Sequence, residues 1–356
     1  MILKVAVFGC GAVARDQHLP CLADLPGVEF VAVCDRNPER AAKLAKLYGV
    51  PRSFADPGEL LESCEVDFVD IVTPPESHRV LAEQALGAGC HALIEKPFVY
   101  SVEDADAVLD AAAAAGRHIS VIHNDLFTPG IDELHRRVAA GEIGEVCAVH
   151  FFEGRRDQRF VPDPWYFRTF GGRLGETLPH ALYQLTEFFD DLEVEHVAVR
   201  HLGHMVPPEG VEPGTLGSDE LHVVLQSGAG NAMATLSYSL NANVPKSLLV
   251  CGTRGTLTAF PYGSVSPHLG KAPDLRQLIR RFPADWSRAL ARVWQRRFAR
   301  PSRIERLRQG AHYRQLHEFV EALMAGRAPR VSGSIARDVV RLWEAIAPRI
   351  DAAGSA

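Results

Sequence analysis

Short apolar runs alternate with segments of helical periodicity through the first 120 residues of the chain. The runs predict buried strands, and the segments between them, with apolar residues three or four positions apart, predict amphipathic helices. Such alternation is typical of α/β proteins with a parallel, doubly wound sheet. The predicted strands are 2–8, 29–34, 67–72, 91–94 and 118–122, and the predicted helices are about 12–25, 38–48, 77–88 and 101–115.

The pattern beyond about residue 125 has more strand character. Glycine-containing turns such as 227–230 and 252–255 separate neighbouring runs, so we expect one antiparallel sheet with helices over one face. A stretch rich in Pro and Gly, 203–217, predicts a loop. The predicted strands are 145–152, 194–201, 220–226, 232–238, 247–251 and 255–260, and helices at about 310–325 and 333–350 are expected to fold back onto the body.

The segment Gly9-Cys10-Gly11-Ala12-Val13-Ala14 follows the first predicted strand directly. This arrangement is typical of a dinucleotide site, because the second glycine lets the backbone approach a pyrophosphate and the helix N-terminus stabilises its charge. Asp35 ends the second strand, where a carboxylate accepts hydrogen bonds from a ribose 2′-hydroxyl and repels a 2′-phosphate. We therefore predict NAD rather than NADP, a preference that the neighbouring Arg36 weakens. The predicted cofactor contacts in this region are Gly9, Gly11, Ala12, Val13, Asp35 and Arg36.

Composition and charge narrow the class of protein. With 356 residues, 47% hydrophobic and 23% charged, the chain can bury a large core and form two domains. The formal charge of -6 argues against a general affinity for nucleic acid. No run of 18 apolar residues exists, and the first residues lead directly into a strand, so we expect a cytoplasmic protein. The 7 cysteines are scattered without a C-x-x-C pair, which favours reduced thiols and predicts no metal site.

Glu95-Lys96-Pro97 follows the predicted strand 91–94, which places Lys96 at the carboxyl edge of the parallel sheet. Open α/β sheets bind their ligands at this edge, so the ammonium is a candidate catalytic group. We expect Pro97 to be cis and to aim the lysine, because a fixed turn removes conformational freedom. Taken alone, a surface lysine with an acidic neighbour is the simpler interpretation.

A second candidate group opens an apolar helix. Gly171 and Gly172 lead to Glu176 and His180, which are four residues apart and share one face of a helix. A carboxylate one turn away can orient an imidazole and stabilise its charged form, which prepares a histidine for proton transfer. A helix-surface pair is the alternative, because the chain has 15 histidines.

Taken in order along the chain, these motifs resemble those of the Gfo/Idh/MocA oxidoreductases, the family of glucose-fructose oxidoreductase and inositol dehydrogenase. The resemblance includes Val72-Thr73-Pro74-Pro75 with His78, the segment 141–146 and the strand turn 252–256, and it extends over nearly the whole chain. It implies an NAD-binding Rossmann domain at 1–123 and a substrate-binding α+β domain at 124–356 with an open, largely antiparallel sheet.

The resemblance also implies roles for single residues. Lys96 takes the place of the active-site lysine, His180 that of the proton-transfer residue, and Glu176 that of an acid that is usually Asp. Since Glu replaces Asp, the carboxylate could orient His180 instead of contacting substrate. Leu178 and Leu126 stand where many members have Gly and Arg, so substrate recognition is expected to differ. Further implied contacts are Thr73, Pro74, His78, Glu95 and Lys96 for the cofactor and Asn124 and Tyr183 for the substrate.

Arginines gather between the first strand of the second domain and the His180 helix. Their guanidinium groups could bind a carboxylate or phosphate bidentately, and a solvated loop is the alternative. The cluster comprises Arg155, Arg156, Arg159, Arg168 and Arg173, of which Arg155, Arg156 and Arg168 are the candidate substrate contacts.

Residues 271–308 carry 12 Lys and Arg against three acidic residues. Trp286, Leu290 and Trp294 belong to an apolar stripe at helical spacing. We expect an amphipathic helix over 284–299 that packs against the protein's own sheet or a second subunit. Binding to a membrane surface or a polyanion is the alternative.

Together these features predict an NAD-dependent oxidoreductase. It would transfer hydride between nicotinamide and a secondary alcohol or ketone of a sugar, polyol, sugar acid or nucleotide sugar, with either His180 or Lys96 as the base. The alternatives are a non-redox enzyme that uses bound NAD transiently, for elimination or glycoside cleavage, and a non-catalytic NAD-binding regulator. The expected partners are a small-molecule substrate and a second copy of the chain, joined through the C-terminal sheet.

Overall fold

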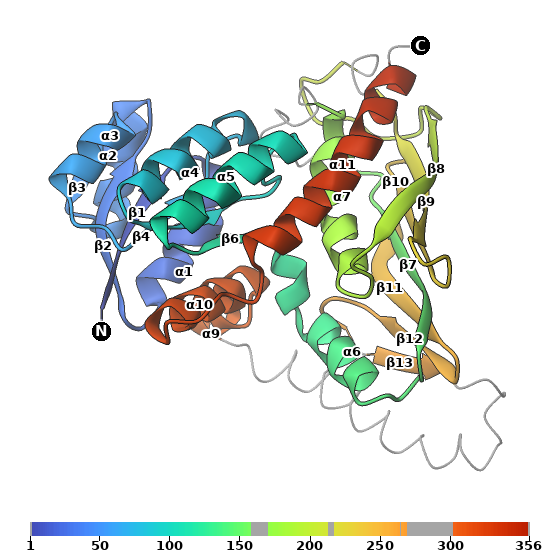
Figure 1. Ribbon diagram of the computed structural model, residues 1–356. Coiled ribbons are helices and arrows are strands. Elements are labelled where there is room, and N and C mark those ends of the chain that lie inside the picture. The colour runs from blue at the N-terminus through green and yellow to red at the C-terminus, as the bar shows by residue number, and fades with distance from the viewer. Residues whose placement is uncertain (1, 158–169, 213–216, 264, 269–301, 355–356) are drawn as a thin grey trace.

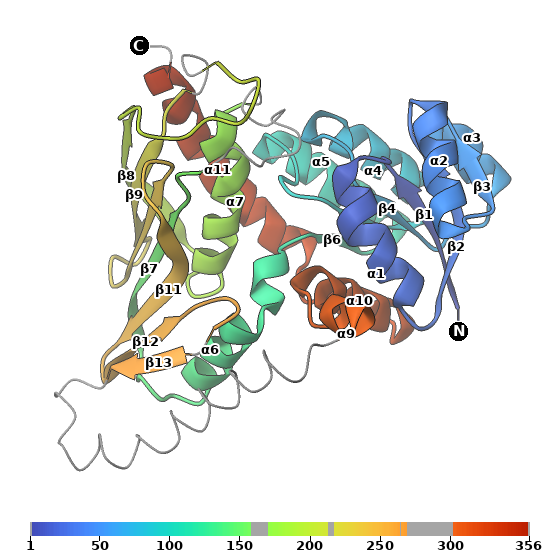
Figure 2. The ribbon, with the colours of Figure 1, turned by 180° about the vertical axis from the view of Figure 1, so that it is seen from behind.

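Two sheets with packed helices make up the part of the chain that the computed structural model describes, residues 2–157, 170–212, 217–263, 265–268 and 302–354. The first sheet lies on the left of Figure 1 and the second on the right, and helix α11 (Gly333–Gly354) runs between them, as the reverse view in Figure 2 also shows. The predicted helix 284–299 lies outside the described residues. None of the described helices is long and apolar enough to cross a bilayer.

The first sheet has six parallel strands in the order β3-β2-β1-β4-β5-β6. This is the strand order of the Rossmann fold, and its direction reverses between β1 and β4, where such folds bind their ligands. The strands are β1 (Leu3–Phe8), β2 (Val28–Cys34), β3 (Arg52–Phe54), β4 (Phe68–Ile71), β5 (His91–Ile94) and β6 (Ile119–Val121).

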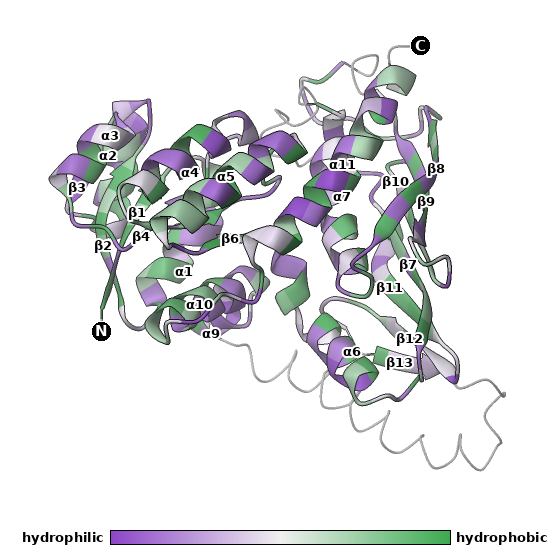
Figure 3. Ribbon diagram, in the orientation of Figure 1, coloured by the Kyte–Doolittle hydropathy of each residue, from purple (hydrophilic) through white to green (hydrophobic). Residues whose placement is uncertain are grey.

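Both faces of this sheet are buried, because successive side chains of a strand point to opposite sides and helices cover each side. Val5 and Val7 belong to a core with helices α1 (Leu19–Asp24) and α2 (Pro38–Tyr48), whereas Ala6 and Phe8 belong to a core on the other face. In Figure 3 the strands of this sheet are largely green, whereas the helices show alternating purple and green turns. The helices of the second face are α3 (Pro57–Ser63), α4 (His78–Gly87) and α5 (Val102–Ala115).

Local sequence explains where helix α2 begins and ends. The Asn37 side chain accepts hydrogen bonds from the backbone N–H groups of Glu39 and Arg40 at 3.1 and 3.2 Å, and Pro38 occupies the first helical position. Gly49, which directly follows the predicted helix 38–48, ends the helix with a φ of 67°. Strand β3 and helix α3 were not predicted. The three residues of β3 include exposed Arg52 and form no apolar run that could have indicated a strand.

The second sheet has seven strands in the order β13-β12-β11-β7-β10-β9-β8. Most neighbours are antiparallel, which confirms the expectation of a largely antiparallel sheet, and β10 pairs with β7 in parallel. Among the described elements, a helix and two strands lie between β7 and β10, and this length of chain allows the crossover that a parallel pair requires. The strands are β7 (Val146–Gly154), β8 (Leu192–Arg200), β9 (Glu220–Ser227), β10 (Met233–Ser239), β11 (Val244–Gly252), β12 (Gly255–Ala259) and β13 (Val265–His268).

Helices α6 (Pro129–Ala139) and α7 (Gly172–Thr186) pack on the side of this sheet that faces the first domain (Figure 1). The last helices return to both domains. α10 (Ala311–Met324), preceded by the short α9 (Arg303–Arg308), contributes Leu316 and Phe319 to the core of β1. α11 contributes Trp343 to the second core and Val340 to the first. The carboxyl edge of the parallel sheet faces α7, because the residue that follows β5 by two positions, Lys96, contacts Glu176 on α7.

Candidate active site

Lys96 follows β5 at the carboxyl edge of the parallel sheet, and the Lys96–Pro97 peptide bond is cis, as predicted. Lys96 Nζ donates to the Glu176 carboxylate on α7 and lies 3.3 Å from the Glu176 carbonyl oxygen. Arg173, also on α7, donates to the other carboxylate oxygen. Burial alone would raise the pKa of Glu176, but Lys96 and Arg173 lower it to about 2. Glu176 is therefore a carboxylate held between two cations.

His180 has partners that the sequence did not predict. Its Nδ1 lies 2.7 Å from the hydroxyl oxygen of Tyr183 and 3.4 Å from Oδ2 of Asp125. The expectation that Glu176 orients His180 is thus corrected, because the Glu176 carboxylate is turned toward cations. Asp125, in the 3-10 turn Asn124–Phe127 after β6, provides the carboxylate instead.

The environment of His180 favours its neutral form. Burial, and then the positive charge of Lys96, lowers its pKa below the usual value, although Asp125 acts in the opposite direction. When Nδ1 carries the proton, the lone pair is on Nε2. Within the described part of the chain, the Nε2 atom of His180 has no hydrogen-bond partner. This nitrogen can therefore accept a proton.

A second lysine, Lys246, lies at the site and belongs to no predicted motif. Lys246 Nζ on β11 is 2.8 Å from Oδ2 of Asp125 and 3.1 Å from Oε2 of Glu153 on β7. Burial lowers the pKa of Lys246, but the two carboxylates raise it above its usual value. Burial raises the pKa of Asp125, but His180 and Lys246 together lower it by more. The pKa of Asp125 therefore lies below its usual value. In the sequence, the one indication of this charged group of Lys246, Asp125 and Glu153 is the position of Asp125 shortly after a predicted strand.

Tyr183, a predicted substrate contact, is fully buried. Its hydroxyl accepts from the backbone N–H of Asp125 at 3.2 Å, donates to Oδ1 of Asn124 at 3.4 Å and contacts His180. The hydroxyl therefore lies on the Nδ1 side of His180, and its hydrogen bonds are with groups of the protein. Asn124, the other predicted contact, is only partly buried.

The glycine turn has the shape that a dinucleotide requires. Gly9 has a φ of 97°, and a Cβ on it would lie 2.5 Å from the carbonyl oxygen of Val72, so no larger residue fits. A Cβ on Gly11 would meet nothing within 4 Å, and the following Ala12 and Val13 are exposed. The backbone of this turn is open to a pyrophosphate.

Asp35 lies beside the glycine turn. Its carboxylate accepts from the backbone N–H of Cys10 at 2.8 Å and from that of Asn37 at 2.9 Å. Arg36 is exposed, and the nearest guanidinium is that of Arg40, whose Nη1 lies 3.9 Å from Asp35. The residues present thus fit a ribose diol at this position.

Two predicted cofactor contacts are occupied within the protein. Both ring nitrogens of buried His78 lie within 3.0 Å of backbone carbonyl oxygens, those of Thr73, Pro97 and Phe98. His78 therefore ties the loop after β4 to the loop after β5 and has no nitrogen left for NAD, which corrects that expectation. Glu95 is 7% exposed, and its carboxylate accepts from the backbone N–H of Lys96 and contacts His18. Thr73 and the exposed Pro74 remain at the end of β4.

Three arginines of the predicted cluster, Arg155, Arg156 and Arg173, belong to the described part of the chain. Arg155 and Arg156 are exposed, and Arg156 donates from Nε to the carbonyl oxygen of His204 at 3.1 Å. Arg159 and Arg168 lie outside the described residues. Of the three arginines that the structure describes, Arg173 reaches the site, where it pairs with Glu176.

Comparisons with known proteins agree with this geometry. The model of the oxidoreductase family with an NAD-binding Rossmann fold matches residues 3–123, and that of the GFO/IDH/MocA C-terminal domain matches residues 131–258. D-apiose dehydrogenase of Paraburkholderia graminis is 38% identical over 170 residues, which cover 44% of this chain and 45% of that protein. The 4-carboxy-2-hydroxymuconate-6-semialdehyde dehydrogenase of a Sphingobium species is 29% identical over 68% of this chain and 74% of that protein.

Solved structures share the whole fold. An oxidoreductase from Agrobacterium radiobacter, in complex with NAD+, L-tartaric acid and magnesium, superposes with a TM-score of 0.75 at 23% identity. The superposition covers 99% of this chain and 97% of that chain. The family models together match more than half of the chain, in both domains. The chain therefore belongs to the Gfo/Idh/MocA oxidoreductase family.

Proposed function

We propose that this protein is an NAD-dependent oxidoreductase that transfers hydride between nicotinamide and a secondary alcohol or ketone of a sugar-like substrate. The observation that carries the proposal is the meeting of Lys96, Glu176 and His180, from both domains, at the carboxyl edge of the parallel sheet. Nucleotides bind at this edge in open α/β folds. A protein that only bound NAD would need neither the lysine nor the histidine.

The glycine turn and Asp35 would hold the cofactor. When bound, the nicotinamide supplies the acceptor or donor of hydride. The buried Asp35 carboxylate favours a ribose 2′-hydroxyl and repels a 2′-phosphate, which supports NAD over NADP. The guanidinium of Arg40, whose Nη1 lies 3.9 Å from Oδ2 of Asp35, weakens this preference, an effect that we had expected from Arg36.

The chain's own residues divide the proton chemistry between them. In the oxidative direction, His180 removes the hydroxyl proton at Nε2, while Lys96 donates a hydrogen bond to the same oxygen and stabilises the developing negative charge. Glu176 fixes the Lys96 ammonium, and Tyr183 and Asp125 fix the imidazole. We assign the base to His180 because its pKa is lowered and its Nε2 is available.

The charges of the site support a neutral substrate. Every cation placed there by the described residues contacts a carboxylate, and the two signs balance. A carboxylated or phosphorylated substrate would have to displace one of these buried partners. A sugar or polyol is therefore favoured over a sugar acid. The balanced groups are Lys96, Arg173 and Lys246 with Glu176, Asp125 and Glu153.

A substrate screen tests the proposal. Purified protein is mixed with NAD and with neutral sugars, polyols and sugar acids, and NADH formation is followed by absorbance. NADH that forms with a neutral polyol or sugar, and that is lost in Lys96→Ala, supports the proposal. Turnover without net NADH would instead favour transient oxidation by bound NAD. Tight NAD binding with no turnover would favour a regulator.

We further propose that two copies associate through the second sheet. Helices α6 and α7 cover its inner side, while outward-facing Phe152 and Leu249 on β7 and β11 are only partly buried. Light scattering after size exclusion should give a dimer, and Leu249→Asp should shift it to a monomer. A monomeric wild type would overturn this proposal.

A further inference from the structure

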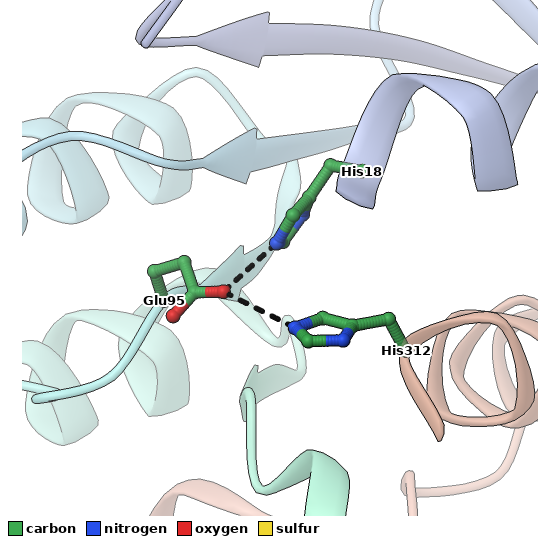
Figure 4. Close-up of side chains that lie close together, drawn as sticks. All are labelled: His18, Glu95 and His312. Carbon is green, nitrogen blue, oxygen red and sulfur yellow. Dashed lines mark hydrogen bonds and ion pairs between the residues drawn. The ribbon is translucent and has the colours of Figure 1, made fainter. Parts of the chain in front are cut away.

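Four titratable side chains meet beside the Glu95-Lys96-Pro97 turn. His18 comes from the π-helical turn Ala14–His18 that follows the glycine turn, and Asp70 comes from β4. Glu95 follows β5, and His312 belongs to α10 (Figure 4 shows His18, Glu95 and His312). His18 and Asp70 are completely buried. The cluster thus joins the helix that follows the glycine turn to the Glu95-Lys96-Pro97 turn.

The hydrogen bonds of His18 define its charge. Nδ1 lies 2.8 Å from Oδ2 of Asp70, and Nε2 lies 2.9 Å from Oε1 of Glu95. When both ring nitrogens donate to these carboxylate oxygens, the imidazole carries two protons and a positive charge. Burial opposes this charge, but Asp70 and Glu95 raise the pKa of His18 to about 10. His312, in contrast, is neutral near pH 7, because burial lowers its pKa to about 4.

The cluster reaches the catalytic lysine through Glu95. While one oxygen of the Glu95 carboxylate contacts His18, the other accepts from the backbone N–H of Lys96 at 2.8 Å. An unbroken path therefore runs from Asp70 through His18 and Glu95 to the Lys96 backbone. Each link is a charge-assisted hydrogen bond in a buried region, where such bonds are strong.

We propose that His18 is a positioning residue: as a buried imidazolium it fixes Glu95, and through Glu95 the backbone of Lys96, relative to the helix that follows the glycine turn. The effect on turnover rests on the proposed role of Lys96 in hydride transfer. The charge of His18 does not rest on that role, so it can be tested separately.

A metal ion is the competing interpretation. Among the described residues, His18, Glu95 and His312 form one group whose ligand atoms lie within 4.8 Å of one another. A zinc ion would take the place of the proton on His18 Nε2, with Asp70 behind Nδ1. The 2.9 Å contact of His18 with Glu95 is that of a direct hydrogen bond, while His312 Nε2 is 3.9 Å from the same oxygen. The geometry favours the proton.

Nitrogen-15 NMR of the wild-type protein, labelled at histidine, tests the charge without any variant. Both ring nitrogens of His18 should show protonated signals that stay unchanged through the pH range in which free imidazole titrates. A neutral tautomer near pH 7 would overturn the proposal. So would one equivalent of zinc that binds tightly and removes the proton signal of Nε2.

Kinetics of His18→Gln test the positioning role. We expect kcat to fall roughly tenfold or more, as for a lost hydrogen bond to a charged group, while KM and the NAD dissociation constant change little. His317→Gln is the matched control, because His317 lies on the surface of α10 and pairs with Glu321. An unchanged kcat in folded His18→Gln would overturn the role.

A pH profile separates positioning from mere stability. The pKa of His18 is raised in the folded state. The stabilisation by the charged His18 contacts is therefore fully present below the ordinary imidazole pKa and is lost as the pH rises through about 10. Asp70→Asn removes one of the raising charges, so the alkaline limb of kcat should move to lower pH. An unmoved limb would contradict the proposal. The ionisable groups around His18 are Asp70, Glu95, His312 and, beside Asp70, Cys21.

Discussion

Replacing Glu176 by Gln tests the charge arrangement of the site most directly. If Glu176 only oriented His180, the change would be mild. In the structure its carboxylate accepts from both Lys96 and Arg173, and all three side chains are no more than 15% exposed. The amide nitrogen of Gln would face one of these donors, and that buried cation would lose its ion pair with the carboxylate. Loss of one partner of a buried ion pair lowers the free energy of unfolding by about 3–5 kcal/mol.

The pKa of Glu176 gives a second measure of the same effect. Its fall from 4.5 to about 2 corresponds to a stabilisation of about 3 kcal/mol. Because the folded-state pKa lies below the unfolded value, this stabilisation is complete above pH 4.5 and is lost as the pH falls toward about 2. The difference in stability between wild type and Glu176→Gln should therefore be large at neutral pH and should shrink through this acidic window.

Urea unfolding followed by circular dichroism, at neutral pH and within the acidic window, measures the difference. Glu83→Gln on α4 is the matched control, because Glu83 pairs with Arg79 at 2.9 Å on the surface. That pair should contribute less than about 1 kcal/mol. Turnover of Glu176→Gln should also fall, since the Lys96 ammonium is no longer fixed. A loss of stability as small as that of Glu83→Gln, or one independent of pH, would refute the reasoning.

Further predictions concern cofactor, chemistry and substrate. Asp35→Ser should weaken NAD binding and narrow the preference over NADP; titration of both cofactors measures this, and stronger NADP binding by wild type would contradict it. Lys96→Ala and His180→Ala should each lower turnover roughly 100-fold with an unchanged circular dichroism spectrum. The acidic limb of kcat/KM for oxidation should lie below the ordinary imidazole pKa of about 6.5, because burial and Lys96 lower that of His180. Arg155→Ser with Arg156→Ser should leave KM for a neutral polyol unchanged, and a raised KM would return these arginines to the site.

Much of the fold could be predicted because its signals are local. A glycine turn between a strand and a helix, an Asn-Pro helix start and alternating apolar runs each occupy a few consecutive residues, and together they predict a parallel, doubly wound sheet. The parallel pairing of β7 with β10 could not be predicted in this way, because it depends on how the chain returns after α7, β8 and β9.

The site was predictable only in part, for the same reason. Lys96 and His180 belong to motifs, but Lys246 is a single lysine that strand pairing brings to Asp125 from 121 residues away. His18 likewise has no local signal, since its meaning depends on Asp70 and Glu95 at the ends of other elements. Side chains that complete a site through tertiary pairing are invisible to a search for motifs.

The incorrect pairing of Glu176 with His180 has a physical cause that extends beyond this site. Spacing along a helix shows which side chains can meet, but burial decides which of them do. A buried carboxylate must be compensated, and an ammonium or guanidinium group compensates it better than an imidazole that burial makes neutral. Glu176 therefore pairs with Lys96 and Arg173, and His180 contacts Asp125 instead. The same rule explains His18, which is charged because no other cation among the described residues is in contact with both Asp70 and Glu95.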